Sequence, residues 1–127
     1  MAQYPLYLKK YTQSVGDFQP MLQSIANNQL TPVDIVDIIF DKDVALGYQV
    51  SFQTYRRTDT SYVEGTGDIF ATYNKDTATW RVDAENKFDS TGVYFAVTAL
   101  GQLQYNTNDM PDPNYEGQIT ITGMTPE

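Results

Sequence analysis

Four aspartates, Asp34, Asp37, Asp41 and Asp43, lie close together in the sequence. Carboxylate oxygens at short spacing are the ligands that hard cations such as calcium prefer. The segment lacks the glycine that a calcium-binding helix–loop–helix requires within its loop. We therefore expect a solvated acidic turn that keeps a neighbouring apolar strand in solution, and we expect no metal and no other cofactor.

An acidic pair and a glycine pair are two further candidates for chemistry. Asp83 and Glu85 are carboxylates of the kind that glycoside hydrolases use in pairs. A chain with 16 acidic residues contains many such pairs, so this one does not by itself indicate catalysis. Residues 65–67, Gly-Thr-Gly, lack the helix-opening context of a phosphate-binding loop, and we expect them to form a flexible hairpin tip.

The composition excludes several classes of function. The chain has no His and no Cys, which excludes Ser–His–Asp and Cys–His nucleophiles, thiolate metal sites and disulfides. Its 8 basic and 16 acidic residues give a net charge of -8, which repels a polyphosphate backbone. We predict a protein that is not an enzyme and has no nucleic-acid partner, with a small acid–base enzyme as a distant alternative.

The distribution of apolar residues predicts neither a membrane span nor a secretory signal. No apolar run reaches spanning length, and residues 1–10 carry their charges after a short apolar patch. We expect a soluble protein, made in a host cytoplasm and without a membrane partner. Its 127 residues suit a single domain over residues 1–127.

The elements that position these residues are predicted to be strands, because apolar and polar residues alternate along much of the chain. Residues 48–52 form one such run, and residues 69–73 form another. A turn-forming Asn-Lys-Asp at 74–76 separates the second run from a third at 78–82, which predicts a hairpin with Trp80 pointing into the core.

The second half of the chain continues this pattern. Residues 93–97 are apolar on both faces, which favours a central strand covered on each side, and Gly101 is expected to turn the chain. Residues 118–122 form a last strand, after an irregular loop at 106–114 that contains two prolines. About seven or eight short strands at this spacing predict an all-β, antiparallel β-sandwich.

Residues 18–27 also fit the spacing of a short helix. Their apolar residues recur at helical intervals after Asp17, a possible cap. The turn signals at Asn27-Asn28 and Thr31-Pro32 favour extended segments instead, so a strand is preferred.

The step Asp89-x-x-Gly92-x-Tyr94 is typical of immunoglobulin-like sandwiches, which place it at the corner before a core strand. There the Tyr hydroxyl bonds back to nearby backbone. Together with Trp80, these residues are predicted to define the fold. Tyr94 and Trp80 are expected in the core.

Several of these motifs recur in one order that resembles a known family. The order is Gly16-Asp17, Asn27-Asn28, Pro32-Val33-Asp34-Ile35, a strand ending in Arg56-Arg57, the strand at 78–82, Asp89-x-x-Gly92-x-Tyr94 and Ile119-Thr120-Ile121. It resembles the N-terminal immunoglobulin-like domain of phage baseplate upper proteins and related phage virion proteins. The resemblance implies a non-enzymatic structural protein of a tailed-phage virion, an assembly, adaptor or decoration module in the baseplate, tail or capsid.

Two apolar segments are candidate partner-binding surfaces for such a protein. One is an N-terminal arm at residues 1–10, with Tyr4, Leu6, Tyr7 and Leu8, which is either a first strand or a strand donated to a neighbouring subunit. The other segment is too apolar to be left exposed and is either core or covered by another subunit. Its residues are Ile35, Val36, Ile38, Ile39 and Phe40. The expected partners are copies of the chain and other virion proteins.

The tyrosines support an alternative function. Exposed aromatic rings stack on sugars or anchor protein partners, so the alternative is a carbohydrate-binding module that recognises cell-surface carbohydrate. The tyrosines near segment ends are Tyr4, Tyr7, Tyr11, Tyr55, Tyr62 and Tyr105. Many of them are equally expected to pack between strands.

Overall fold

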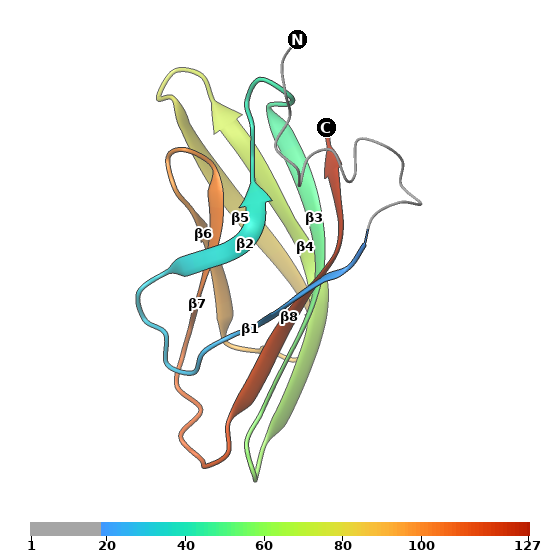
Figure 1. Ribbon diagram of the computed structural model, residues 1–127, viewed down its shortest axis with the longest axis vertical. Helices are drawn as coiled ribbons and strands as arrows, with labels where there is room; N and C mark the ends of the chain where they lie inside the picture. Colours follow the sequence, from blue (N-terminus) through green and yellow to red (C-terminus); the bar gives the residue numbers. More distant parts are fainter. Residues whose placement is uncertain (1–18) are drawn as a thin grey trace.

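The computed structural model describes residues 19–127, and the regular elements of this part of the chain are all β-strands (Figure 1). Its eight strands are β1 (Met21–Ser24), β2 (Val33–Ile39), β3 (Gly47–Arg57), β4 (Tyr62–Asn74), β5 (Thr79–Phe88), β6 (Val93–Val97), β7 (Gln102–Thr107) and β8 (Glu116–Pro126). They form two antiparallel sheets that pack as a sandwich. The predicted all-β sandwich is therefore confirmed.

The ambiguous segment near residues 18–27 contains a strand. β1 pairs antiparallel with β8, with Met21 opposite Ile121 and Ser24 opposite Gln118. The strand interpretation is thus confirmed and the short helix is wrong. No part of residues 19–127 forms a helix with the length and apolar character needed to cross a membrane.

The larger sheet has the strand order β1-β8-β3-β4-β5, and the smaller has the order β2-β7-β6. In the larger sheet β3, β4 and β5 are consecutive neighbours, and β8 returns from the other sheet to lie beside β3 (Figure 1). This placement of a returning strand next to the first of three is the Greek-key arrangement found in most β-sandwiches.

The core lies between the inner faces of the two sheets. Tyr48, Val50 and Phe52 of β3 are all buried, as their alternation predicted. Trp80 is also buried and packs against Phe40, with ring centroids 5.4 Å apart, so the expectation that it points inward is confirmed. The remaining buried apolar residues from both sheets are Ile25, Ile35, Ile38, Ile69, Ala71, Leu103, Tyr105, Ile119, Ile121 and Met124.

The hairpin of β4 and β5 forms as expected, but its glycines have another role. The Asn74 side chain accepts hydrogen bonds from the backbone N–H groups of Asp76 and Thr77, which closes the turn. Gly65 and Gly67 are not at a hairpin tip; they lie inside β4. A Cβ on Gly67 would overlap the backbone carbonyl oxygen of Glu85, so glycine here allows β5 to approach closely.

The corner motif is present, but Tyr94 does not serve it. Tyr94 is 54% exposed, because β6 is an edge strand and only its other face meets the core. The expectations of a central strand and of a core Tyr94 are therefore wrong. Asp89 does hold the corner: its carboxylate accepts a hydrogen bond from the Glu64 backbone N–H at 3.0 Å. Gly92 adopts the left-handed region, with φ of 70°.

A buried arginine, and not the Tyr94 hydroxyl, bonds to the backbone next to this corner. Arg56 of β3 has no exposed surface. Its guanidinium donates to Asn27 Oδ1 (2.9 Å), the Thr91 carbonyl (2.8 Å), Asn108 Oδ1 (2.6 Å), the Asn108 carbonyl (2.7 Å) and the Tyr115 hydroxyl (3.1 Å). Its carbon Cζ also lies 5.3 Å from the centre of the Tyr115 ring, a cation–π contact. We call these five residues the Arg56 network.

The Arg56 network joins segments that are distant in sequence. Asn27 lies between β1 and β2, Thr91 between β5 and β6, and both Asn108 and Tyr115 between β7 and β8. An arginine has five N–H donors, so the five hydrogen bonds to neutral acceptors satisfy the guanidinium. Removal of the side chain would leave the carbonyl of the buried Thr91 without this donor, which is costly, whereas Asn27, Asn108 and Tyr115 keep access to water.

Replacement of Arg56 by Lys is expected to lower the free energy of unfolding by about 2–4 kcal/mol, because a single ammonium group cannot donate to all the acceptors that the planar guanidinium reaches. Urea unfolding measures the change. Arg57→Lys is the matched control: its side chain is exposed and its ion pair with Glu116 is loose at 3.8 Å, so a change within about 0.5 kcal/mol is expected. Equal effects of the two substitutions would contradict the role given to the network.

Candidate functional site

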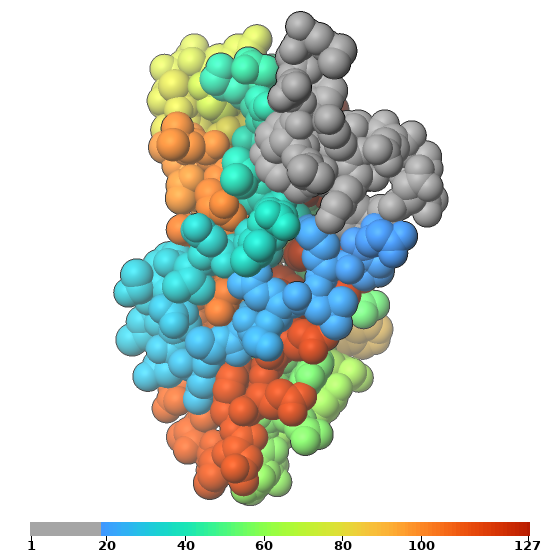
Figure 2. Space-filling view, viewed as in Figure 1, coloured from blue at the N-terminus to red at the C-terminus, as the bar shows by residue number. Residues whose placement is uncertain are grey.

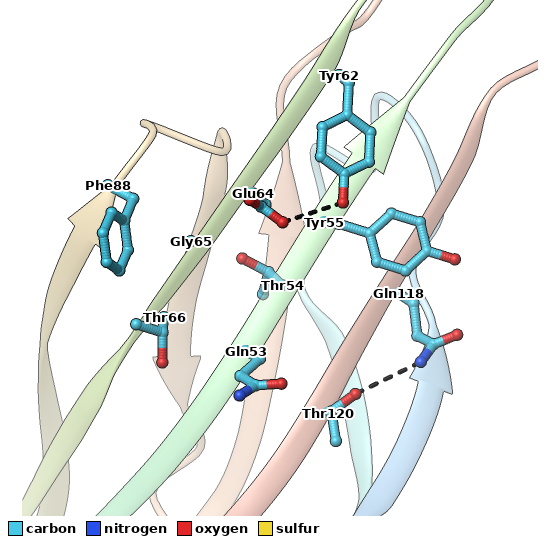
Figure 3. A pocket seen from close by; sticks show the side chains of 10 residues that line it. All are labelled: Gln53, Thr54, Tyr55, Tyr62, Glu64, Gly65, Thr66, Phe88, Gln118 and Thr120. Carbon is cyan, nitrogen blue, oxygen red and sulfur yellow. Dashed lines mark hydrogen bonds between the residues drawn. The ribbon is translucent and has the colours of Figure 1, made fainter.

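A depression of about 470 Å³ lies on the outer face of the five-stranded sheet (Figure 3). It runs across β8, β3, β4 and the end of β5. Three aromatic residues, Tyr55, Tyr62 and Phe88, stand around it. The other lining residues are small or polar: Gln53, Thr54, Glu64, Gly65, Thr66, Gln118 and Thr120. We call this set of residues the aromatic face.

The two tyrosines come from neighbouring strands. Tyr55 lies opposite Glu64 in the pairing of β3 with β4, and Tyr62 is two residues before Glu64, which makes the tyrosines a diagonal cross-strand pair. Their ring centroids are 6.1 Å apart and the ring planes differ by 16°. The two rings are therefore nearly parallel and stacked, and Figure 3 shows them at one end of the depression.

Carboxylates hold both tyrosine hydroxyls. Tyr55 donates a hydrogen bond to Glu116 of β8, and Tyr62 donates to Glu64 Oε2 at 3.1 Å. In each case the hydrogen bond to the carboxylate is the main reason that the pKa of the phenol is raised above its ordinary value, since the acceptor favours the protonated form. Both phenols therefore remain neutral donors well beyond neutral pH, and the rings stay oriented.

The third aromatic residue is held in a strained conformation. Phe88 is 84% exposed and has a left-handed φ of 75°, a region that costs a non-glycine residue on the order of 1–3 kcal/mol. It ends β5 opposite Gly65, and the Asn86 side chain donates to the Asp89 carbonyl at 2.6 Å beside it. The corner that Asp89 closes thus places the ring of Phe88 at the end of the depression opposite to the tyrosines, across β4 (Figure 3).

Side-chain amides and hydroxyls supply polar groups between the rings. Gln53 and Gln118 face the depression from β3 and β8 (Figure 3). Gln118 donates to Thr120 Oγ1 at 3.4 Å, and Thr66 donates to the Phe52 carbonyl at 2.9 Å. An amide offers two donors and an acceptor, so both glutamines retain capacity for a ligand. The arrangement suits binding by stacking and hydrogen bonding.

The acidic residues singled out in the sequence are spread over separate places. Asp34 accepts a hydrogen bond from Gln104 at 2.9 Å, whereas Asp41 accepts one from the Asp43 backbone N–H at 2.8 Å in the following turn. Within residues 19–127, no group of three or more His, Cys, Asp or Glu side chains is arranged to hold a metal ion. Asp83 and Glu85 lie exposed on β5 and do not line the aromatic face.

The second predicted partner segment is mostly core. Ile35, Ile38 and Phe40 are buried, so these three do not form a partner-binding surface. Ile39 is partly buried against the same core. Only Val36 is exposed, at 63%. The other predicted segment, residues 1–10 with Tyr4, Leu6, Tyr7 and Leu8, lies outside the described residues.

Val36 belongs to a second surface, where the edges of the two sheets meet. It lies with Leu22, which is 66% exposed, along a groove of about 230 Å³ between β1 and β2. Gln23 joins the two strands: its amide donates to the Asp34 carbonyl at 3.0 Å and accepts from the Val36 N–H at 2.9 Å. Figure 2 shows the blue β1 and cyan β2 residues meeting on one face. We call Leu22, Gln23 and Val36 the β1–β2 seam.

The tyrosines near segment ends are exposed at the surface at only some positions. Tyr55 and Tyr62 are brought together at the surface, but Tyr105 is buried and accepts a hydrogen bond from the Ala26 N–H at 3.2 Å. Tyr4, Tyr7 and Tyr11 lie outside the described residues. Phe88 could not be predicted from the sequence, since a phenylalanine rarely adopts the left-handed φ of 75° that it has here.

Comparison with known proteins finds no match to a family model, to a curated protein or to a solved structure.

Replacement of Glu64 by Gln is expected to lower the pKa of Tyr62, because it removes the charge that stabilises the phenol over the phenolate. A pH titration of ¹³C-labelled tyrosine followed by NMR measures this change. Glu127→Gln, at an exposed site outside the aromatic face, is the control and should leave the pKa of Tyr62 unaltered. An unchanged pKa in Glu64→Gln would mean that the carboxylate does not hold the hydroxyl.

Proposed function

We propose that this protein is a non-enzymatic structural protein of a tailed-phage virion, an immunoglobulin-like module that joins other components through protein–protein contacts. The proposal starts from the order of motifs that resembles phage baseplate upper proteins and related virion proteins. Its place in the particle is the baseplate, tail or capsid.

The observation that carries the proposal is the position of the resembling motifs in space. Asn27, the strand ending in Arg56 and the step that contains Gly92 are far apart in the sequence. In the structure all three meet at one guanidinium: Asn27 accepts from Arg56, and a Cβ on Gly92 would overlap the Asn108 side chain, another acceptor of Arg56. Motifs that are distant in the sequence but meet around one guanidinium support a common architecture better than isolated turn signals do.

The features of the described surface also favour a protein that is bound by partners. Its acidic residues are dispersed, and five of the eight exposed large apolar residues among residues 19–127 lie on strands of the sandwich. A net charge of -8 keeps such a chain soluble before assembly. Assembly would then bury apolar surface, the main source of stability in protein interfaces.

The β1–β2 seam is the contact surface that we assign to self-association. Leu22 and Val36 are both about two thirds exposed, although each is a large apolar residue on a strand. Asp37 has a φ of 66°, and the pairing of β2 with β7 shifts register between Asp34 and Ile39. Such a bulge re-aims side chains, and here it accompanies the outward position of Val36.

Mass spectrometry of purified phage particles from a strain that encodes the chain tests the proposed function. The protein is expected in a fixed ratio to the major capsid or tail proteins, and it should withstand washing at high salt. Particles that are complete and infectious without it would contradict a role in the virion.

Val36→Asp is expected to weaken self-association by about tenfold or more, because a carboxylate would have to be desolvated in the contact. Size-exclusion chromatography with light scattering over a range of concentrations measures the effect. Leu100→Asp is the matched control, since Leu100 is an exposed apolar residue that does not line the groove of the seam. A wild-type protein that is monomeric at all concentrations, or equal effects of both substitutions, would contradict the assignment.

A further inference from the structure

The aromatic face is separate from the β1–β2 seam. It lies on the outer side of β8, β3, β4 and the end of β5, whereas the seam lies between β1 and β2. Two of its rings are also not needed for the core, because Tyr62 and Phe88 are exposed at 55% and 84%. Three large rings on one solvent face therefore call for an explanation other than folding.

We propose that the aromatic face is a binding site for a neutral polysaccharide. This inference goes beyond the virion proposal and does not rest on it, because it depends only on the geometry of this surface.

The two tyrosine rings suit stacking on sugars. A hexose presents a face of C–H groups, which packs on the face of an aromatic ring. Tyr55 and Tyr62 are nearly parallel and stacked, with centroids 6.1 Å apart. Tyr62 is 55% exposed and Tyr55 is half-buried, so a sugar residue can pack on the exposed surface of the Tyr62 ring, with Tyr55 supporting that ring.

The polar groups between the rings suit sugar hydroxyls. Gln53 and Gln118 carry amides that donate and accept, and they face the same depression as the rings. The aromatic rings supply contact area for a ligand, and the few amides orient it by hydrogen bonds.

The negative charge of the protein indicates which class of polysaccharide the aromatic face can bind. Glu64 and Glu116 hold the tyrosine hydroxyls, and the chain as a whole carries a net charge of -8. An anionic glycan would be repelled both by these carboxylates and by the whole protein. The ligand class is therefore a neutral polysaccharide.

The site is also held rigid before a ligand arrives. Both hydroxyls are hydrogen-bonded, and Phe88 is held in its strained conformation by the corner at Asp89. A preorganised site loses little conformational entropy on binding, which favours affinity.

Affinity electrophoresis of the full chain in native gels tests the proposal, with laminarin, dextran and galactomannan as neutral probes and hyaluronan as the anionic probe. At least one neutral polysaccharide is expected to retard the wild-type protein, whereas hyaluronan is not. Retardation by none of the three neutral probes, or by hyaluronan alone, would overturn the proposal.

Two substitutions locate the site. Tyr62→Ala is expected to lower the affinity for the retarding polysaccharide about fivefold, the size of one lost aromatic contact. Tyr94→Ala is the matched control, because Tyr94 is 54% exposed on the other sheet, and it should leave the affinity unchanged. Equal losses in the two variants would place binding elsewhere and overturn the assignment.

Phe88→Gly separates binding from folding. Glycine adopts a φ of 75° without strain, so the melting temperature is expected to stay the same or to rise. The affinity for the same polysaccharide is expected to fall, because the third ring is lost. A variant that keeps full affinity would show that Phe88 takes no part in the site.

Discussion

The buried guanidinium of Arg56 is the interaction on which the rest of this sandwich depends. A charge without exposed surface must recover the cost of leaving water, which amounts to several kcal/mol for an ion in a protein interior. Neutral acceptors make up that cost here: the side chains of Asn27 and Asn108, two backbone carbonyls and the Tyr115 hydroxyl. Because these groups come from three separate loops, each loop has to be in place for the charge to be satisfied. Gly92 meets the same constraint, since the absence of a Cβ leaves room for the Asn108 side chain and its left-handed φ suits glycine.

The same strand links this network to the surface. Side chains of β3 alternate between the two faces, so the inward position of Arg56 dictates that Tyr55 and Arg57 point outward. A strand fixed by the five hydrogen bonds of one guanidinium cannot slip in register without moving the charge away from its acceptors. The Tyr55 ring is thereby placed against Tyr62 of β4, and the corner at Asp89 places Phe88 at the opposite end of the same depression. The Arg56 network thus helps to position the side chains of the aromatic face on the outer side of the larger sheet.

Short sequence patterns predicted those structural features that depend only on neighbouring residues in the chain. The alternation in β3, the turn at Asn74 and the inward Trp80 follow from neighbouring residues, and the structure confirms them. Tyr94 was misplaced because its burial depends on whether β6 is central or at an edge, which is a property of the whole sheet. The burial of Arg56 could not be predicted from the sequence, since an arginine at a strand end is normally exposed and its acceptors lie in three distant loops. Of the aromatic face, the sequence suggested two tyrosines but neither their pairing nor the third ring.

Hydrogen exchange of backbone amides in Arg56→Lys tests the central claim most directly. The N–H groups of Asn28 and Asn108 bond to loop carbonyls beside the network, at 3.1 Å each, whereas the Phe40 N–H bonds to the Gly101 carbonyl away from it. The account predicts that exchange at Asn28 and Asn108 accelerates at least about tenfold more than exchange at Phe40, as expected for local opening. Equal acceleration at all three amides, or none at Asn28 and Asn108, would contradict the claim that Arg56 holds these loops together.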